Sequence, residues 1–130
     1  MDSVVHFEMA YADRERMAKF YSAAFGWQTQ MLGPEMGDYV VAVTTPSPNN
    51  MPTTPGHING GFYRKNADKP EMNAPSVVIA VTDIQQAMAK VRNAGGAVLG
   101  EPVPIPGVGA YVSFLDTEGN RASILQPSPR

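Results

Sequence analysis

Two side chains capable of acid–base chemistry, His6 and Glu8, lie two residues apart in the apolar segment 4–10. If this segment is a β-strand, alternation places both side chains on one face and leaves Phe7 and Met9 for the other. A neighbouring carboxylate orients an imidazole and raises its pKa by favouring the charged form. The pair therefore predicts either a polar anchor or acid–base pair for a ligand, or two buried polar groups that satisfy each other.

The chain offers few imidazole or thiolate ligands for a metal. The two histidines are His6 and His57, and the absence of cysteine excludes disulfides, thiolate metal sites and a cysteine nucleophile. His57 joins His6 and Glu8 in a candidate metal-binding set if Asn59, rather than Gly60, faces the same side of the sheet. The sequence contains no phosphate-binding glycine loop, dinucleotide fingerprint, HExxH motif or GxSxG motif.

Length and composition limit the class of protein. The 130 residues are 43% hydrophobic and 17% charged, which is typical of one globular domain with a core of its own. The net charge of −2 and the lack of long Lys/Arg runs disfavour binding to nucleic acid or to an anionic membrane. No signal peptide or membrane-spanning segment is recognisable, so a cytoplasmic location is expected.

The elements that must position these side chains repeat along the chain at a shift of 70 to 71 residues. A strand-like run, an Asp, an amphipathic helix and a Gly occur in the first half and again in the second half. The spacing of apolar residues predicts helices over 14–25 and 84–94, with Asp13 and Thr82 or Asp83 as their N-terminal caps. The expected strands are 4–10, 27–32, 38–44, 57–64, 76–81, 97–99, 110–115 and 121–126.

This order predicts an α+β fold of two βαβββ modules, about 4–64 and about 76–127, joined by a polar linker at 65–75 within a single domain, 4–127. Since each half is marginal on its own, we expect the two to form a curved mixed sheet around a cleft, with the helices outside. A cleft of this kind is a natural small-molecule site. Tyr39 and Tyr111 occupy equivalent positions in the two copies, where they serve either the strand core or ligand contact.

Three further segments have a structural and a functional interpretation. Asn59-Gly60-Gly61 lies inside an expected strand, where glycine weakens the strand. It predicts a β-bulge or the close approach of another strand, and the functional alternative is a ligand lying against bare backbone. The breaker-rich loops 45–56 and 104–109 are expected near the cleft mouth or a partner subunit.

Five segments together resemble the vicinal oxygen chelate superfamily (VOC domain), which includes glyoxalase I, bleomycin- and fosfomycin-resistance proteins and extradiol dioxygenases. They are Val5-His6-Phe7-Glu8, the helix end Phe20-Tyr21 through Phe25-Gly26-Trp27, Ile58-Asn59-Gly60-Gly61-Phe62, Pro104-Ile105-Pro106-Gly107-Val108-Gly109, and Phe114-Leu115-Asp116-Thr117-Glu118-Gly119-Asn120-Arg121. The resemblance covers about residues 4–127, is nearest to a glyoxalase-like branch, and implies a homodimer. It does not specify a reaction, because this fold hosts many chemistries.

The resemblance also implies a divalent metal held by one residue from the first and one from the last strand of each half. The positions that match the family pattern are His6, Ser76, Ser123, and Asn59 or Gly60. Of these, only His6 is a good ligand, because Zn²⁺, Ni²⁺ and Fe²⁺ prefer imidazole or carboxylate. We therefore expect the standard metal site to be absent and no cofactor to be required. The relocated set of His6, Glu8 and His57 is the metal-binding alternative.

These observations predict a small-molecule binding protein of the glyoxalase/bleomycin-resistance type. The expected ligand-binding residues are His6, Glu8, Tyr39, Asn59, Ser76, Tyr111 and Ser123. The alternative is an enzyme — a lyase similar to lactoylglutathione lyase, an isomerase or a dioxygenase — that uses a relocated metal, or His6 and Glu8 as acid and base. A third possibility is an interaction or structural module.

Overall fold

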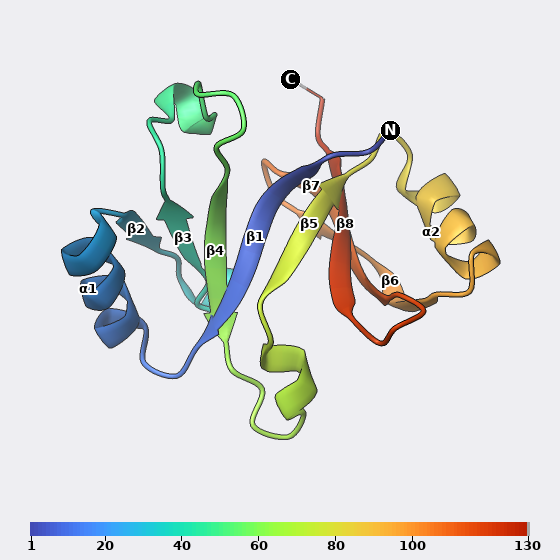
Figure 1. The fold of residues 1–130 in the computed structure, drawn as a ribbon, viewed down its shortest axis with the longest axis horizontal. Coiled ribbons are helices and arrows are strands. Elements are labelled where there is room, and N and C mark those ends of the chain that lie inside the picture. Colours follow the sequence, from blue (N-terminus) through green and yellow to red (C-terminus); the bar gives the residue numbers. More distant parts are fainter. Residues whose placement is uncertain (130) are drawn as a thin grey trace. The chain divides into compact units, whose positions relative to one another are not determined.

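The chain is divided into two compact units in the computed structural model, which describes residues 1–129. Module one is His6–Pro75, and module two is the chain from Ser76 onward together with Met1–Val5. Each module contains one α-helix and four strands, so the predicted α+β fold of two βαβββ modules is confirmed (Figure 1). The first residues group with module two because the Ala80 N–H donates to the Ser3 carbonyl at 2.9 Å.

Module one is a mixed sheet with a helix on one face. Its elements are β1 (Val4–Tyr11), α1 (Arg14–Phe25), β2 (Gln28–Met31), β3 (Val40–Val43) and β4 (Asn59–Arg64), with short 3₁₀ helices at Pro34–Met36, Pro48–Asn50 and Pro70–Asn73. The strand order is β2-β3-β4-β1, and β1 runs parallel to β4. As predicted, α1 is capped by Asp13, whose Oδ1 accepts from the Arg16 N–H at 3.0 Å, and it ends at the left-handed Gly26.

Module two repeats this arrangement. Its elements are β5 (Ser76–Ala80), α2 (Ile84–Asn93), β6 (Ala97–Ile105), β7 (Gly109–Leu115) and β8 (Arg121–Pro127). The strand order is β5-β8-β7-β6, with β5 parallel to β8, which matches the order of β1, β4, β3 and β2 in module one. The Asp83 side chain caps α2 by accepting from the Gln86 N–H at 3.0 Å, so Asp83 rather than Thr82 is the cap.

The hairpin between β6 and β7 is longer than the sequence predicted. β6 continues to Ile105 instead of ending at residue 99, with a register shift between Leu99 and Val103. Half of the predicted loop 104–109 is therefore paired strand, since Pro104 lies opposite Ala110 and Ile105 opposite Gly109, and residues 106–108 form the turn. The prediction stopped early because Gly100 and the prolines read as chain breakers, whereas the irregular register accommodates them.

Each sheet packs its core against its own helix. In module one the core consists of Tyr11, Val40, Ala42 and Phe62, with Phe7, Met9, Met17, Tyr21 and Trp27 packed against it. In module two it consists of Val81, Ile84, Met88, Val112 and Ile124. Because Phe7 and Met9 belong to the helix side, alternation along β1 directs His6 and Glu8 to the opposite face, as predicted. Within residues 1–129, no helix has the length and apolar character needed to cross a membrane.

Candidate functional site

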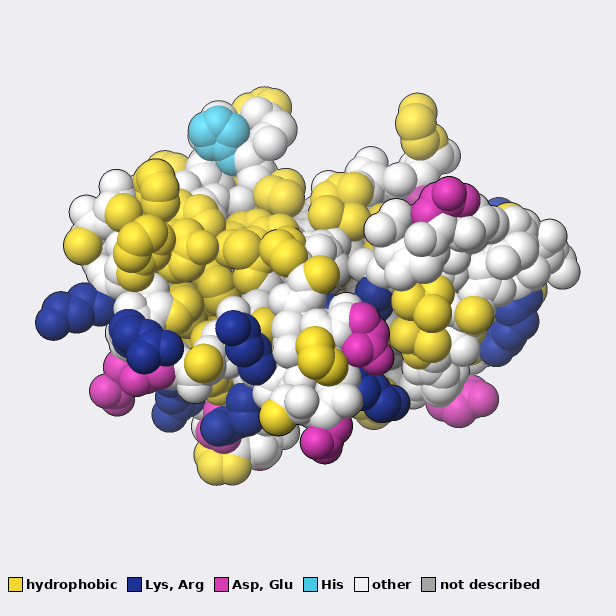
Figure 2. Space-filling model, turned by 60° about the horizontal axis from the view of Figure 1, so that its bottom comes forward, with side chains coloured by type: hydrophobic (Ala, Val, Ile, Leu, Met, Phe, Trp, Pro, Cys, Tyr) yellow, Lys and Arg dark blue, Asp and Glu magenta, His cyan; other side chains and the backbone are white. Residues whose placement is uncertain are grey.

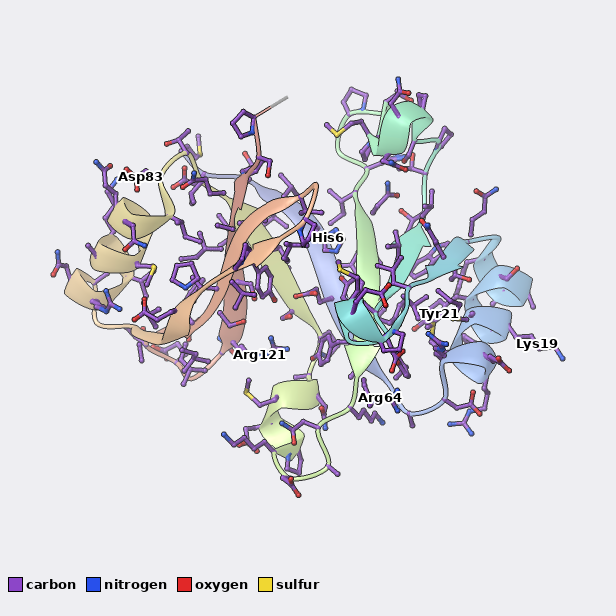
Figure 3. The ribbon with its side chains drawn as sticks, turned by 180° about the vertical axis from the view of Figure 1, so that it is seen from behind. His6, Lys19, Tyr21, Arg64, Asp83 and Arg121 are labelled. Carbon is purple, nitrogen blue, oxygen red and sulfur yellow. The ribbon has the colours of Figure 1, made fainter. Side chains whose placement is uncertain are left out.

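A hydrogen-bonded cluster, the Tyr39 cluster, joins His6, Glu8 and Tyr39 in module one. The Tyr39 hydroxyl donates to Glu8 Oε2 at 2.9 Å and lies 3.0 Å from His6 Nε2. Because the one hydroxyl proton is directed to the carboxylate, His6 Nε2 must carry a proton and donate it to the Tyr39 oxygen. Glu8 is only 6% exposed, and Figure 3 shows His6 on β1. Sequence reasoning named all three residues, and the structure brings them together.

The charge state of His6 differs from the one that the sequence suggested. Burial lowers the pKa of the His6 imidazole below its usual 6.5, and the Glu8 carboxylate opposes this with a smaller upward effect. The expected upward effect of Glu8 on the His6 pKa is therefore present, but desolvation by burial outweighs it, so the net shift is downward. Near pH 7 His6 is neutral, with its proton on Nε2. Its Nδ1 lone pair is then a hydrogen-bond acceptor and a potential base.

The lowered His6 pKa predicts a pH-dependent stability. The unfolded chain binds a proton near pH 6.5 more readily than the folded chain does, so the free energy of unfolding should fall as the pH drops below about 6.5. The His6 contribution is complete above that pH and is lost by the time the pH has passed below the folded-state pKa. Urea denaturation between pH 5 and 8 measures this. A His6→Gln variant should lack this part of the slope, and equal slopes in the two proteins would contradict the assignment.

Tyr39 is held in place by a tight turn that precedes β3. The Tyr11 hydroxyl donates to the Asp38 carbonyl at 2.7 Å, and Arg64 Nη2 donates to Asp38 Oδ2 at 2.8 Å. The Leu32 N–H donates to the Tyr39 carbonyl at 2.9 Å. Asp38 itself adopts a left-handed conformation with φ of 56°, which aspartate tolerates better than most residues. These contacts fix the backbone from which the Tyr39 ring extends.

The two glycines of β4 make room for aromatic rings. A Cβ at Gly61 would overlap the Tyr39 hydroxyl, and a Cβ at Gly60 would overlap the Phe7 ring on the other face. The ladder between β1 and β4 stays regular here, with Phe7 opposite Gly60 and Glu8 opposite Gly61. The predicted bulge or close approach of another strand was therefore wrong. Glycine is required because side chains, rather than backbone, approach the strand.

Asn59 lies on the His6 face but uses its side chain to organise a loop. Its Oδ1 accepts from the Thr44 N–H at 2.9 Å, and its Nδ2 donates to Ser47 Oγ at 2.7 Å. Both amide ends are thus engaged with the segment that follows β3. Asn59 lies opposite His6 in the ladder between β1 and β4, next to the Tyr39 cluster. Its side chain stabilises the loop that follows β3.

His57 is exposed and belongs to the same loop. Its Nδ1 lies 3.1 Å from Thr45 Oγ1. Across residues 1–129, no three side chains among His, Asp and Glu are grouped so that they could hold a metal ion. The structure therefore does not bring His57 together with His6 and Glu8. This holds even though Asn59 faces the same side of the sheet as His6, which was the condition for the candidate metal-binding set.

Module two carries a second cluster, the Ser123 cluster, made of Tyr111, Ser113 and Ser123. The Tyr111 hydroxyl lies 2.7 Å from Ser123 Oγ, and Ser113 Oγ lies 2.9 Å from the same atom. Ser123 is fully buried, and Ser76 is 8% exposed with a buried hydroxyl that has no hydrogen-bond partner within the described chain. Sequence reasoning missed Ser113, although its place two residues after Tyr111 on one strand puts it on the same face.

The two modules can be compared position by position through their parallel strand pairs. Glu8 lies opposite Gly61 in module one, and Val78 lies opposite Ser123 in module two, so Gly61 is the counterpart of Ser123. The last-strand metal position of module one is therefore Gly61 rather than Asn59 or Gly60. In module one the Tyr39 hydroxyl fills the space of the missing side chain, whereas in module two Tyr111 bonds to the side chain present there.

This comparison tests the metal site that the superfamily implies. The four positions are occupied by His6, Gly61, Ser76 and Ser123, which supply one imidazole, no carboxylate and two neutral hydroxyls. The Nε2 atom of His6 is already engaged by Tyr39. Because divalent transition metals require several imidazole or carboxylate ligands, this donor set does not fit the implied metal.

Comparison with known proteins identifies the family. A model described as the Glyoxalase/Bleomycin resistance protein/Dioxygenase superfamily matches residues 3–124, and the chain belongs to this superfamily. A glyoxylase-like domain-containing protein of Didymella fabae is 34% identical over 121 residues, covering 90% of this chain and 88% of that protein. CFP32 of Mycobacterium tuberculosis, provisionally named as a glyoxylase, is 41% identical over 54 residues, which are 42% of this chain and only 21% of CFP32.

Solved structures support the same fold. Hypothetical protein BH1468 from Bacillus halodurans superposes with a TM-score of 0.71 at 13% identity, covering 99% of this chain and 96% of that one. A methylmalonyl-CoA epimerase variant from Streptomyces coelicolor, in complex with 2-nitronate-propionyl-CoA, superposes with a TM-score of 0.69 at 15% identity, covering 97% of each chain. At these identities the likeness establishes the fold alone.

Proposed function

We propose that this protein binds small organic molecules without a divalent metal, and that the Tyr39 cluster of module one and the Ser123 cluster of module two each supply hydrogen-bonding groups for a ligand. The observation that carries the proposal is the Tyr39 hydroxyl, which occupies the space that a side chain at position 61 would fill and bonds to both His6 and Glu8. The superfamily pattern has a metal ligand at position 61. In this chain the Tyr39 cluster lies there instead, and it consists of neutral groups and one carboxylate that form hydrogen bonds. Recognition by such a surface depends on ligand oxygens and protons rather than on a Lewis acid.

The chemistry of each cluster favours a particular kind of ligand group, which is a hydrogen-bond donor at the Tyr39 cluster and an oxygen acceptor at the Ser123 cluster. Glu8 and the Nδ1 atom of His6 accept hydrogen bonds, and the hydroxyls of the Ser123 cluster donate to oxygen. The buried Ser76 hydroxyl without a partner is costly in the free protein, and a ligand oxygen would satisfy it. Since a similar fold binds an acyl-CoA analogue in the Streptomyces coelicolor epimerase, short acyl-CoA thioesters are the first compounds to test.

Calorimetric titration with methylmalonyl-CoA, propionyl-CoA and acetyl-CoA tests the proposal. We expect saturable binding that is weakened by Ser76→Ala and by Tyr39→Phe, and left unchanged by chelators. Ser22→Ala, an exposed serine on α1, is the matched control and should bind as the wild type does. Binding that requires added Zn²⁺, Ni²⁺ or Fe²⁺ would contradict the proposal.

An isomerase is the second candidate, favoured by the neutral His6. An unprotonated Nδ1 can accept a proton from the carbon next to a thioester carbonyl and return it to the same carbon, which leaves the substrate composition unchanged. In D₂O this cycle exchanges the α-hydrogen of methylmalonyl-CoA for deuterium, which mass spectrometry measures. Exchange that is catalysed by the wild type and abolished in His6→Gln would favour the enzyme. Binding without exchange favours the binding protein.

A symmetric homodimer is a further part of the proposed function. Phe20 and Phe25 on α1 are 57% and 65% exposed, which is more aromatic surface than a monomer usually leaves in water. Light scattering at micromolar concentration should therefore give about twice the chain mass of 14.0 kDa. A mass equal to that of one chain would contradict the prediction.

A further inference from the structure

Module one contains a cavity on the helix side of its sheet, opposite the face that carries the Tyr39 cluster. The cavity has a volume of about 390 Å³, is largely open to solvent, and lies between the first turns of α1 and the ends of β1 and β4. Its volume falls within the range of about 300–1,000 Å³ that is typical of small-molecule sites. Nothing proposed above for His6, Glu8 or Tyr39 involves this cavity.

The interior of the cavity is apolar. Met9, Met17, Tyr21 and Phe62 line it, and Phe20 reaches it from the exposed side of α1. Figure 2 shows hydrophobic side chains gathered on the left of the view, the α1 side, with Lys and Arg side chains beside them. In Figure 3, Tyr21 lies between α1 and the sheet, whereas Lys19 points away from the sheet.

The mouth of the cavity carries more positive than negative charge. Arg16 and Lys65 line it from α1 and from the residue after β4, and both side chains are exposed. The one carboxylate there, Asp13, uses its Oδ1 to accept from the Arg16 N–H at the start of α1. An anionic head group would therefore meet two exposed cations, together with the positive end of the α1 dipole.

We propose that this cavity is a binding site for a medium-chain carboxylate, with the alkyl chain between α1 and the sheet and the carboxylate between Arg16 and Lys65. The apolar lining excludes a fully polar ligand, and the cationic rim favours an acid over a neutral lipid or an amine.

The probe for this proposal is octanoate, with octan-1-ol as its neutral analogue. The chain contains one tryptophan, Trp27, whose ring stacks on Tyr21 at 4.6 Å, so its fluorescence reports on the cavity wall. We expect saturable fluorescence changes with octanoate and weaker binding of octan-1-ol. Replacing both Arg16 and Lys65 with Gln should weaken octanoate binding by about five- to tenfold while leaving octan-1-ol unaffected.

A filling variant and a matched control complete the test. Ala12 lines the mouth and is exposed, so Ala12→Leu should fold normally and abolish octanoate binding. Ala23→Leu, an exposed alanine farther along α1, should leave octanoate binding unchanged. His6→Gln should also leave it unchanged, which separates this site from the proposed function of the Tyr39 cluster.

Three results would overturn the proposal. The first is equal affinity for octanoate and octan-1-ol, and the second is octanoate binding that survives Ala12→Leu. The third is the absence of saturable octanoate binding, whatever the oligomeric state. Light scattering on Ala12→Leu would then show whether the dimer is lost as well. That last outcome would assign the surface to a second copy of the chain instead.

Discussion

Replacing Gly61 with alanine should destabilise module one by about 1–3 kcal/mol, the usual cost of inserting a group into filled space. The new Cβ would overlap the Tyr39 hydroxyl, so the ring must move and its bonds to His6 and Glu8 must break. Replacing glycine also reduces the conformational entropy of the unfolded chain, which stabilises the folded state. This gain is smaller than the cost of the overlap. Urea denaturation near pH 7.5 gives the change in the free energy of unfolding.

The neighbouring glycine is a matched control for this prediction. Gly60→Ala overlaps the Phe7 ring on the other face, so it should destabilise module one to a similar degree without moving Tyr39. The two variants should differ in the His6 titration, which NMR can follow because the chain has only two histidines. Only Gly61→Ala should shift the His6 pKa toward its usual value. An unchanged His6 titration in Gly61→Ala would contradict the role assigned to this glycine.

Replacing His6 with Gln should weaken binding of the tightest-binding acyl-CoA by about 1–3 kcal/mol, the cost of a buried polar group without its partner. The Gln amide has a similar size and can still donate to the Tyr39 oxygen, so folding should be nearly unaffected above pH 7. Calorimetric titration measures the affinity, and thermal denaturation is its control. If the variant binds normally but melts at a lower temperature, His6 has a structural role only.

The sequence predicted the elements of the fold well because local signals agree with the packing. Asp13 and Asp83 cap their helices as expected, and the alternation of β1 separates Phe7 and Met9 from His6 and Glu8. The errors occurred where tertiary contacts override local preference. β6 continues past Gly100 because β7 pairs with it, and no propensity of residues 100–105 alone reveals that partner.

The sequence predicted which residues form the candidate site but not the hydrogen bonds that join them. His6, Glu8 and Tyr39 were all named, yet their joining by a single hydroxyl depends on the turn at Asp38 and on the space above Gly61. The sign of the His6 pKa shift also depends on burial, which the sequence does not specify. Whether the two modules enclose a ligand cleft stays a prediction.

Metal content is the most direct test of the central claim that the Tyr39 cluster replaces a metal site. The purified protein should be equilibrated with Zn²⁺, Ni²⁺ and Fe²⁺ in turn, desalted, and analysed by inductively coupled plasma mass spectrometry beside a His6→Ala variant. We predict much less than one metal ion per chain for each metal, with no difference between the two proteins. Stoichiometric metal in the wild type that is lost in His6→Ala would contradict the account.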